Sequence, residues 1–203
     1  MNSIYGNYEN SLEKIKTDLE NRFVLYQEKQ VNETGEKIYE HLSVRIKTDE
    51  SMREKCRRKG VPETLESALV TMKDAIGIRV VCSFIDDVFK VVEFIRTFED
   101  CDIVEEVDYI RHAKSNGYRS YHMILAVHTE EEDVLGNVPG TYYVEIQLRT
   151  IAMDTWAALE HRMSYKKDIP NQELLVSELK RVADELASCD LSMQTIRELI
   201  QNS

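Results

Sequence analysis

The chain has 203 residues, 42% of them hydrophobic and 31% charged, with only 7 Gly and 3 Pro. This length is enough to bury the core of one domain, and the composition excludes collagen-like, low-complexity and disordered chains. The net charge of −11 excludes binding to nucleic acid through a broad basic surface, so any phosphate site must be local.

The N-terminal part predicts a long amphipathic helix over residues 8–26, because apolar residues recur there at steps of three and four. Around residues 42–46, apolar and polar residues alternate. This alternation predicts a short strand whose polar face carries Arg45 and Lys47.

A helix is predicted to follow, with its cap at Thr48 or the next residue and its end at Gly60. A further helix is expected over 63–72. The sequence AIGIRVVCSF at 75–84 is typical of a strand buried on both faces, and 86–98 has the apolar periodicity of a helix.

The second half predicts a hairpin and two helices. The loop at 130–140 joins two β-like runs, a helix follows Thr150 to about residue 165, and a long helix follows Pro170. The three β-like runs cover 103–110, 120–128 and 141–149. The predicted fold class is therefore α+β, with a mixed sheet of about five strands flanked by helices.

The four cysteines include no C-x-x-C pair, which indicates reduced thiols in a reducing compartment. No apolar run approaches the length of a membrane span, and the N-terminus is too charged for a signal peptide. We therefore expect a cytoplasmic protein that binds neither membrane nor DNA.

The segment TYYVEIQLRT carries the sharpest geometric signal, because period-two alternation separates its residues onto two faces. One face would carry Tyr142, Val144, Ile146 and Leu148, and the other would carry Tyr143, Glu145, Gln147 and Arg149. An ordinary half-solvated strand explains the same pattern, and for an isolated strand it is the better explanation.

A second carboxylate, Asp74, immediately precedes the buried strand pattern, and Arg79 follows five residues later. If the two strands are neighbours, Asp74 and Glu145 can hold one Mg²⁺, which prefers one or two carboxylates plus water and substrate phosphate. A turn residue at strand entry explains Asp74 equally well. Zinc-ligand spacings, the phosphate-binding P-loop and the dinucleotide glycine fingerprint are absent.

The segment KSNGYRSYH, residues 114–122, combines an ammonium group, an amide and a flat ring around one glycine. A nucleobase can stack on Tyr118 while Lys114 and Asn116 contact phosphate or ribose. The simpler explanation is a type I′ or II turn at Asn116-Gly117. The basic segment 45–59 has a simpler explanation too, as a solvated amphipathic helix.

Four motifs together, RIKTDESMREK, DAIGIRVV, KSNGYRSYH and VEIQLRT followed by WAALEHRMSYK, resemble the synthetase domain of RelA/SpoT homologues in order and spacing. The whole chain resembles the stand-alone small alarmone synthetases. The resemblance implies a nucleotidyltransferase-like fold with an N-terminal helix at 1–35, a catalytic core at 36–167 and a C-terminal helix at 168–203.

The implied activity is Mg²⁺-dependent transfer of the β,γ-pyrophosphoryl group of ATP to the ribose 3′-hydroxyl of GDP or GTP, giving AMP and (p)ppGpp. The ATP-binding residues implied by the motifs are Arg45, Lys47, Ser51, Lys55 and Arg79. Asp74 and Glu145 match the magnesium site, with Glu145 and Gln147 as catalytic residues. The residues implied for GDP or GTP are Lys114, Asn116, Tyr118 and His122, with Arg149 and His161 as weaker matches.

This chain departs from the family pattern at two places. Relatives usually have glycine before the first arginine, where this chain has Val44, and a basic residue where it has Val107. The second departure removes a phosphate contact that Arg111 or Arg119 can replace. No His-Asp dipeptide of the family's hydrolase domain is present, so synthesis without hydrolysis is expected.

Similar synthetases form homotetramers through their terminal helices, and pppGpp or single-stranded RNA are candidate allosteric partners. Two other functions remain open. A toxin-like relative would pyrophosphorylate adenosine nucleotides or the 3′ end of tRNA, although an acidic chain suits tRNA poorly. A catalytically silent nucleotide- or RNA-binding regulator would be expected to lack Asp74, Glu145 or Tyr118, all of which are present.

Overall fold

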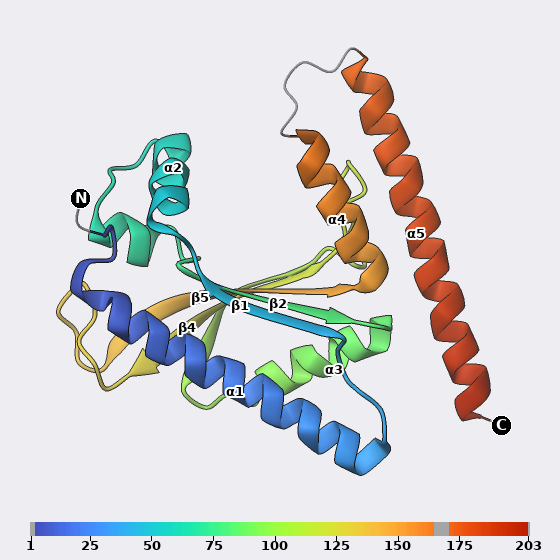
Figure 1. The fold of residues 1–203 in the computed structure, drawn as a ribbon, viewed down its shortest axis with the longest axis horizontal. Coiled ribbons are helices and arrows are strands. Elements are labelled where there is room, and N and C mark those ends of the chain that lie inside the picture. The colour runs from blue at the N-terminus through green and yellow to red at the C-terminus, as the bar shows by residue number, and fades with distance from the viewer. Residues whose placement is uncertain (1–2, 165–170, 203) are drawn as a thin grey trace.

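The computed structural model describes residues 3–164 and 171–202, and a five-stranded sheet forms its centre (Figure 1). The strand order is β1-β2-β5-β4-β3. Strands β2 and β5 pair in parallel, and the other three pairs are antiparallel. The strands are β1 His41–Ile46, β2 Ile76–Cys82, β3 Cys101–Asp108, β4 Tyr121–Thr129 and β5 Gly140–Thr150. The predicted α+β class with a mixed sheet is confirmed.

Helices lie on both sides of the sheet (Figure 1). Apolar residues of α1 and α3 pack against the buried face, where β2, β4 and β5 contribute the core residues. Helices α2 and α4 lie on the other side, and α5 runs past α4 and reaches α3 (Figure 1). The bounds are α1 Glu9–Thr34, α2 Asp49–Lys59, α3 Ile85–Ile95, α4 Ile151–Ser164 and α5 Gln172–Gln201, with a short helix η1 at Gly6–Tyr8.

The structure corrects two predicted boundaries and leaves a third untested. Helix α1 continues to Thr34, where Gly35 ends it with a φ of 75°. Strand β3 covers Cys101–Asp108 rather than 103–110. The predicted end of the helix after Thr150, near residue 165, lies outside the described residues.

The helix predicted over 63–72 is found at 65–71, but it is not a regular α-helix. This segment instead contains a π-helical turn, η2, at Ser67–Thr71, in which the amide of Met72 donates to the carbonyl of Ser67 at 2.9 Å. Buried Ser67, Ala68 and Leu69 fix this turn in the interior. Among the described residues, no helix is both long and apolar enough to span a membrane.

Candidate active site

The strand register gathers polar side chains on one face of the sheet. Parallel pairing of β2 with β5 sets Gly77 opposite Glu145 and Arg79 opposite Gln147, and antiparallel pairing of β4 with β5 sets His122 opposite Gln147. Directly opposed residues share a face. This face carries Arg45, Arg79, Glu145, Gln147 and His122. The alternation predicted for β5 is confirmed, because its apolar residues are buried on the opposite face.

Asp74 lies two residues before β2 and is held in a sharp turn of the chain. Lys73 has a φ of 55°, in the left-handed region that non-glycine residues rarely adopt. Lys47 forms an ion pair with Oδ2 of Asp74, and Nζ of Lys55 lies 2.6 Å from the same atom. Oδ1 is buried and accepts no hydrogen bond from the part of the chain that the structure describes. One carboxylate oxygen is thus neutralised twice, and the other is left for a further ligand.

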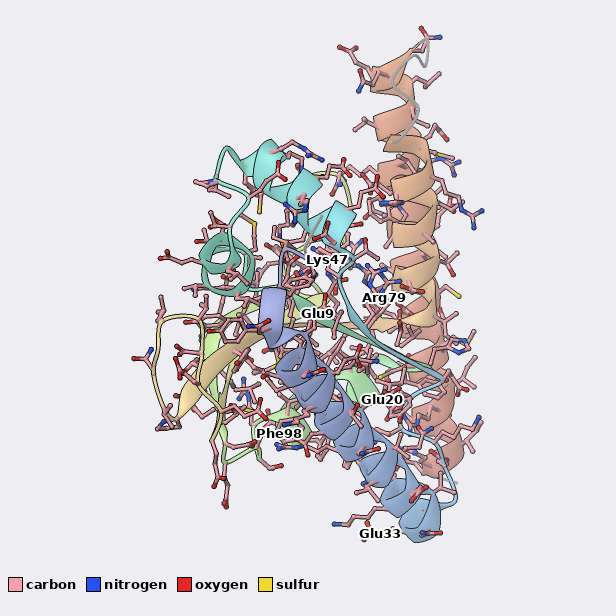
Figure 2. The ribbon with its side chains drawn as sticks, turned by 60° about the vertical axis from the view of Figure 1, so that its left-hand side comes forward. Glu9, Glu20, Glu33, Lys47, Arg79 and Phe98 are labelled. Atoms are coloured by element: carbon pink, nitrogen blue, oxygen red, sulfur yellow. The ribbon has the colours of Figure 1, made fainter. Side chains whose placement is uncertain are left out.

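Helix α2 carries most of the basic segment 45–59. The Thr48 hydroxyl caps it by accepting from the amide of Ser51 at 3.3 Å. Arg53 and Arg57 each pair with a nearby carboxylate, so they are neutralised on the protein surface. The cations that turn toward Asp74 are the two lysines. Figure 2 shows Lys47 near α2 and Arg79 on the side of the sheet where α4 lies.

The turn predicted at Asn116-Gly117 overlaps another one, in which the amide of Gly117 donates to the carbonyl of Lys114 at 2.8 Å. The left-handed φ of 91° belongs to Gly117, and Asn116 has no positive φ, which excludes type I′ and agrees with type II. The side chain of Asn116 instead accepts from the amide of Tyr118 at 3.1 Å. A Cβ added to Gly117 would lie 2.5 Å from Cβ of Ala183 in α5.

The hydroxyl of Tyr118 joins two groups from different strands. Arg149 donates to it at 2.8 Å, and the hydroxyl lies 2.7 Å from Nε2 of His122. A hydroxyl has one hydrogen to donate and two lone pairs to accept with, so that of Tyr118 can bond to Arg149 and to His122 at the same time. Burial, with Arg149 and Lys114 nearby, lowers the pKa of His122 to about 4. His122 is therefore neutral at physiological pH.

Arg149 extends this network along β5. Its guanidinium also donates to Oε1 of Gln147 at 2.8 Å, and Nε2 of Gln147 donates to Glu145 at 3.0 Å. On its other side Arg149 donates to Asp154 of α4 at 3.0 Å. A continuous chain of hydrogen bonds thus runs from Glu145 to Tyr118. Sequence reasoning missed Asp154, because only the turn from β5 into α4 brings it to Arg149.

A cavity of about 530 Å³ opens on this face. Its lining includes Lys55, Tyr109, His122 and Glu145, which come from α2 and from the β3–β5 side of the sheet. A larger groove of about 1220 Å³ lies between α1 and α3 and contains none of the predicted site residues. The cavity beside Glu145 is therefore the candidate for chemistry.

The structure shows what the two departures from the family pattern do. Val44 packs against the core, on the face opposite to that of Arg45, so it does not obstruct the polar face. Val107 lines the cavity and lies opposite His122. Arg111 pairs with Asp108, and Arg119 donates to Gly117, Ala183 and Asp184. Both arginines thus have structural contacts.

Two further predicted residues, Arg79 and His161, are more exposed than Arg149. Arg79 is half exposed, and its guanidinium lies 3.7 Å from Oδ1 of Asp154. His161 is exposed in the last turn of α4. The site therefore has three neighbouring parts. They are the Asp74 turn with its lysines, the Arg45–Arg79 face, and the network around Tyr118.

The chain is similar to one protein family and to known proteins within it. Residues 44–170 match the family described as the region found in RelA/SpoT proteins. The chain is 40% identical over 166 residues to the GTP pyrophosphokinase YwaC of Bacillus subtilis strain 168, covering 81% of this chain and 76% of that protein. It is 33% identical to the GTP pyrophosphokinase YjbM of the same strain, covering 97% of this chain and 88% of that one.

Among solved structures, the chain is similar to small alarmone synthetase 1 from Bacillus subtilis bound to its product pppGpp. The TM-score is 0.76 at 33% identity, and the match covers 96% of this chain and 94% of the other. The sequence motifs, the sheet with its polar face and these matches agree. The chain belongs to the RelA/SpoT family.

Proposed function

We propose that this chain is a (p)ppGpp synthetase. It transfers the β,γ-pyrophosphoryl group of ATP to the ribose 3′-hydroxyl of GDP or GTP. The bond between Pβ and the oxygen bridging to Pα breaks, the bond between Pβ and O3′ forms, and AMP leaves as the 3′-hydroxyl loses its proton. The observation that carries the proposal is one sheet face that joins an arginine pair, Glu145 with Gln147, and the Tyr118 network.

Two arginines suit the adenine of ATP. Arg79 is directly opposite Ser43, and Arg45 is two residues further along β1. Such diagonal neighbours are roughly 7–8 Å apart, which leaves space for one flat ring between two guanidinium planes. The phosphates would be held by Lys47, Lys55 and Ser51. Ser51 lies in the first turn of α2, and helix N-termini favour anions.

Asp74 and Glu145 are the groups proposed to hold Mg²⁺. The donor set fits a hard cation, because both are carboxylates and Oδ1 of Asp74 is buried without a hydrogen-bond partner among the described residues. A bound Mg²⁺ would neutralise the transferred phosphoryl oxygens and acidify the 3′-hydroxyl. Lys47 and Lys55 would then move from Asp74 to the phosphates.

The acceptor nucleotide is proposed to bind at the Tyr118 turn. Arg149 and His122 fix the tyrosine hydroxyl, so its ring is preorganised for stacking on guanine. Nζ of Lys114 lies 5.1 Å from the ring centroid and is placed to reach phosphate. Oδ1 of Asn116 is used in the turn, which leaves its amide nitrogen for the nucleotide.

Glu145 is proposed to orient the 3′-hydroxyl and accept its proton, and Gln147 holds the Glu145 carboxylate through the 3.0 Å hydrogen bond. Positioning and charge neutralisation supply most of the catalysis in phosphoryl transfer. Residues 1–203 would act as one synthetase domain, with residues 36–167 as its catalytic core.

Self-association as a homotetramer is a further part of the proposal. Helix α5 exposes apolar side chains at Leu191, Met193, Ile196, Leu199 and Ile200, and such a surface is typical of an interface. Light scattering during size-exclusion chromatography measures the mass. A monomer at micromolar concentration would contradict this part alone.

The activity is tested with purified protein, Mg²⁺, γ-³²P-labelled ATP and each of GDP, GTP, GMP, AMP and tRNA, with thin-layer separation of the products. Glu145→Gln is the control. We expect label in guanosine 3′-pyrophosphates with wild type and none with the variant. Label only in adenosine nucleotides or tRNA would establish the toxin-like alternative, and no transfer to any acceptor would contradict synthesis altogether.

A further inference from the structure

Arg149 is a buried cation at the centre of the hydrogen-bond network. Only 6% of its surface is exposed, and its two terminal nitrogens bind Gln147, Tyr118 and Asp154. A buried guanidinium requires a counter-charge. Among the described residues the carboxylate that forms this ion pair is Asp154, at 3.0 Å.

Asp154 also reaches the other side of the site. The same Oδ1 that accepts from Arg149 lies 3.7 Å from the guanidinium of Arg79. Arg79 belongs to the proposed ATP subsite, whereas Arg149 holds Tyr118 in the proposed acceptor subsite. One carboxylate oxygen is therefore shared by one arginine from each subsite.

The junction of β5 and α4 fixes Asp154 in this place. Helix α4 begins directly after the strand, and the Thr150 hydroxyl accepts from the amide of Met153 at 3.2 Å. The same hydroxyl donates to buried Asp190 of α5 at 2.6 Å. Asp154 follows in the first helical turn, where a negative charge is favoured by the helix dipole.

We infer that Asp154 is a positioning residue that couples the two nucleotide subsites through Arg79 and Arg149. This inference rests on the proposed synthetase function. A nucleotide that orders Arg79 also orders Oδ1 of Asp154, which then holds Arg149 and the Tyr118 hydroxyl for the second nucleotide. The second nucleotide then loses less conformational entropy on binding, because the first has already ordered these side chains. The two nucleotides therefore bind cooperatively.

The test compares the affinity of GDP with and without saturating α,β-methylene ATP and Mg²⁺, measured by isothermal titration calorimetry. In wild type the ATP analogue should increase GDP affinity by about five-fold or more, the lower end of typical coupling between sites. In Asp154→Asn this ratio should fall to about one. Asp154→Glu keeps the charge and should restore part of the coupling.

The matched control is Thr155→Val. Thr155 is the next residue of α4, it is exposed, and its hydroxyl bonds only to the carbonyl of Ile151 in its own helix. This variant should keep the wild-type ratio. General loss of stability would raise the ratio, because the ATP analogue stabilises the folded state that binds GDP. A fall of the ratio to one therefore reports positioning rather than unfolding.

The same five-fold ratio in Asp154→Asn as in wild type would overturn the inference, as would a wild-type ratio of one. If Asp154→Asn does not fold, Arg79→Gln removes the exposed partner of the same oxygen, and at saturating analogue GDP affinity should no longer rise. The labelled transfer assay on wild type distinguishes a failure of the proposed function from a failure of the role of Asp154. Failure there rejects the synthetase function, whereas transfer with unchanged coupling in the variants rejects only the role of Asp154.

Discussion

The hydroxyl of Tyr118 forms a hydrogen bond of 2.7 Å with Nε2 of His122, while the same oxygen accepts from Arg149. This hydrogen bond keeps the tyrosine ring in place beside a neutral imidazole. His122 thus acts as a hydrogen-bond partner rather than as a positive charge.

The pH dependence of stability follows from this neutral state. The pKa of His122 is about 4 in the folded chain against 6.5 for the free side chain, so the unfolded chain binds a proton more readily. Stability contributed by neutral His122 should be present above about pH 6.5 and decrease as the pH falls toward 4. The difference corresponds to something on the order of 3 kcal/mol.

Urea unfolding at pH 7.5 and at pH 5 measures this loss. His122→Gln is the control, because its amide oxygen can accept from Tyr118 but cannot titrate in this range. We expect the variant to lose less stability than wild type between the two pH values. Equal losses would show that His122 does not carry the effect.

Magnesium alone should bind weakly. In the free protein Lys47 and Lys55 already neutralise Asp74, so an incoming divalent cation meets two ammonium groups. ATP supplies the phosphates that draw these lysines away. Differential scanning fluorimetry should show a Tm shift below about 1 °C for millimolar Mg²⁺ alone, but about 5 °C or more for Mg²⁺ with saturating ATP.

The double variant Lys47→Met with Lys55→Met checks the cause. Without the ammonium groups, Asp74 should bind Mg²⁺ more tightly in the absence of ATP, and the shift with Mg²⁺ alone should increase. A large shift with Mg²⁺ alone in wild type would contradict the argument.

Gly117→Ala should destabilise the protein for two reasons. The residue has a φ of 91°, and its new Cβ would lie 2.5 Å from Cβ of Ala183. Gly35→Ala is a matched control, since Gly35 has a φ of 75° and no atom lies within 4 Å of the place that its new methyl group would take. The control should lose about 1–2 kcal/mol from backbone strain alone, and Gly117→Ala should lose about 1–3 kcal/mol more.

Adding Ala183→Gly to Gly117→Ala removes the clash and should recover the difference between the two single variants. Urea unfolding measures the free energy of unfolding of wild type, the two single variants and the double variant. Equal destabilisation at positions 35 and 117 would show that α5 yields to the extra methyl group.

The loop between β4 and β5 depends on Asp133. Its carboxylate accepts from the amides of Leu135, Asn137 and Thr141. Burial acts to raise its pKa, but these hydrogen bonds prevail and the pKa of Asp133 is below its ordinary value. Asp133→Ala should cost about 2–4 kcal/mol, because several buried donors lose a charged acceptor.

Turnover of Asp133→Ala should stay close to wild type under conditions where the variant is folded, because this loop contributes no lining residue to the cavity. Asp102→Ala removes a carboxylate that pairs with His128 on the surface and should change stability by less than about 1 kcal/mol. Similar costs for both variants would contradict the role of the buried carboxylate.

The sequence predicted the sheet and its polar face because each strand had a local signature. Alternation in β5 separates Glu145 and Gln147 from the core residues, and no distant contact is needed to see it. The sequence predicted a helix at 63–72 but not its form, because local periodicity does not reveal the π-helical turn that contains buried Ser67.

Contacts between distant segments of the chain could not be predicted from the sequence. Lys47, Lys55 and Asp74 come from three segments, and their shared ion pairs exist only in the folded chain. Asp154 follows Arg149 by five residues, a spacing that has no meaning in either a helix or a strand. Its contact arises because a strand ends and a helix begins between the two residues.

The packing of Gly117 against Ala183 has a consequence for how this chain can vary. A larger side chain at either position meets the other, so substitutions at the two positions should be correlated among homologous chains. Helix α5 thus packs directly against the turn that precedes Tyr118. Shortening or fusing the C-terminal end should therefore be assessed by its effect on the acceptor nucleotide as well as on assembly.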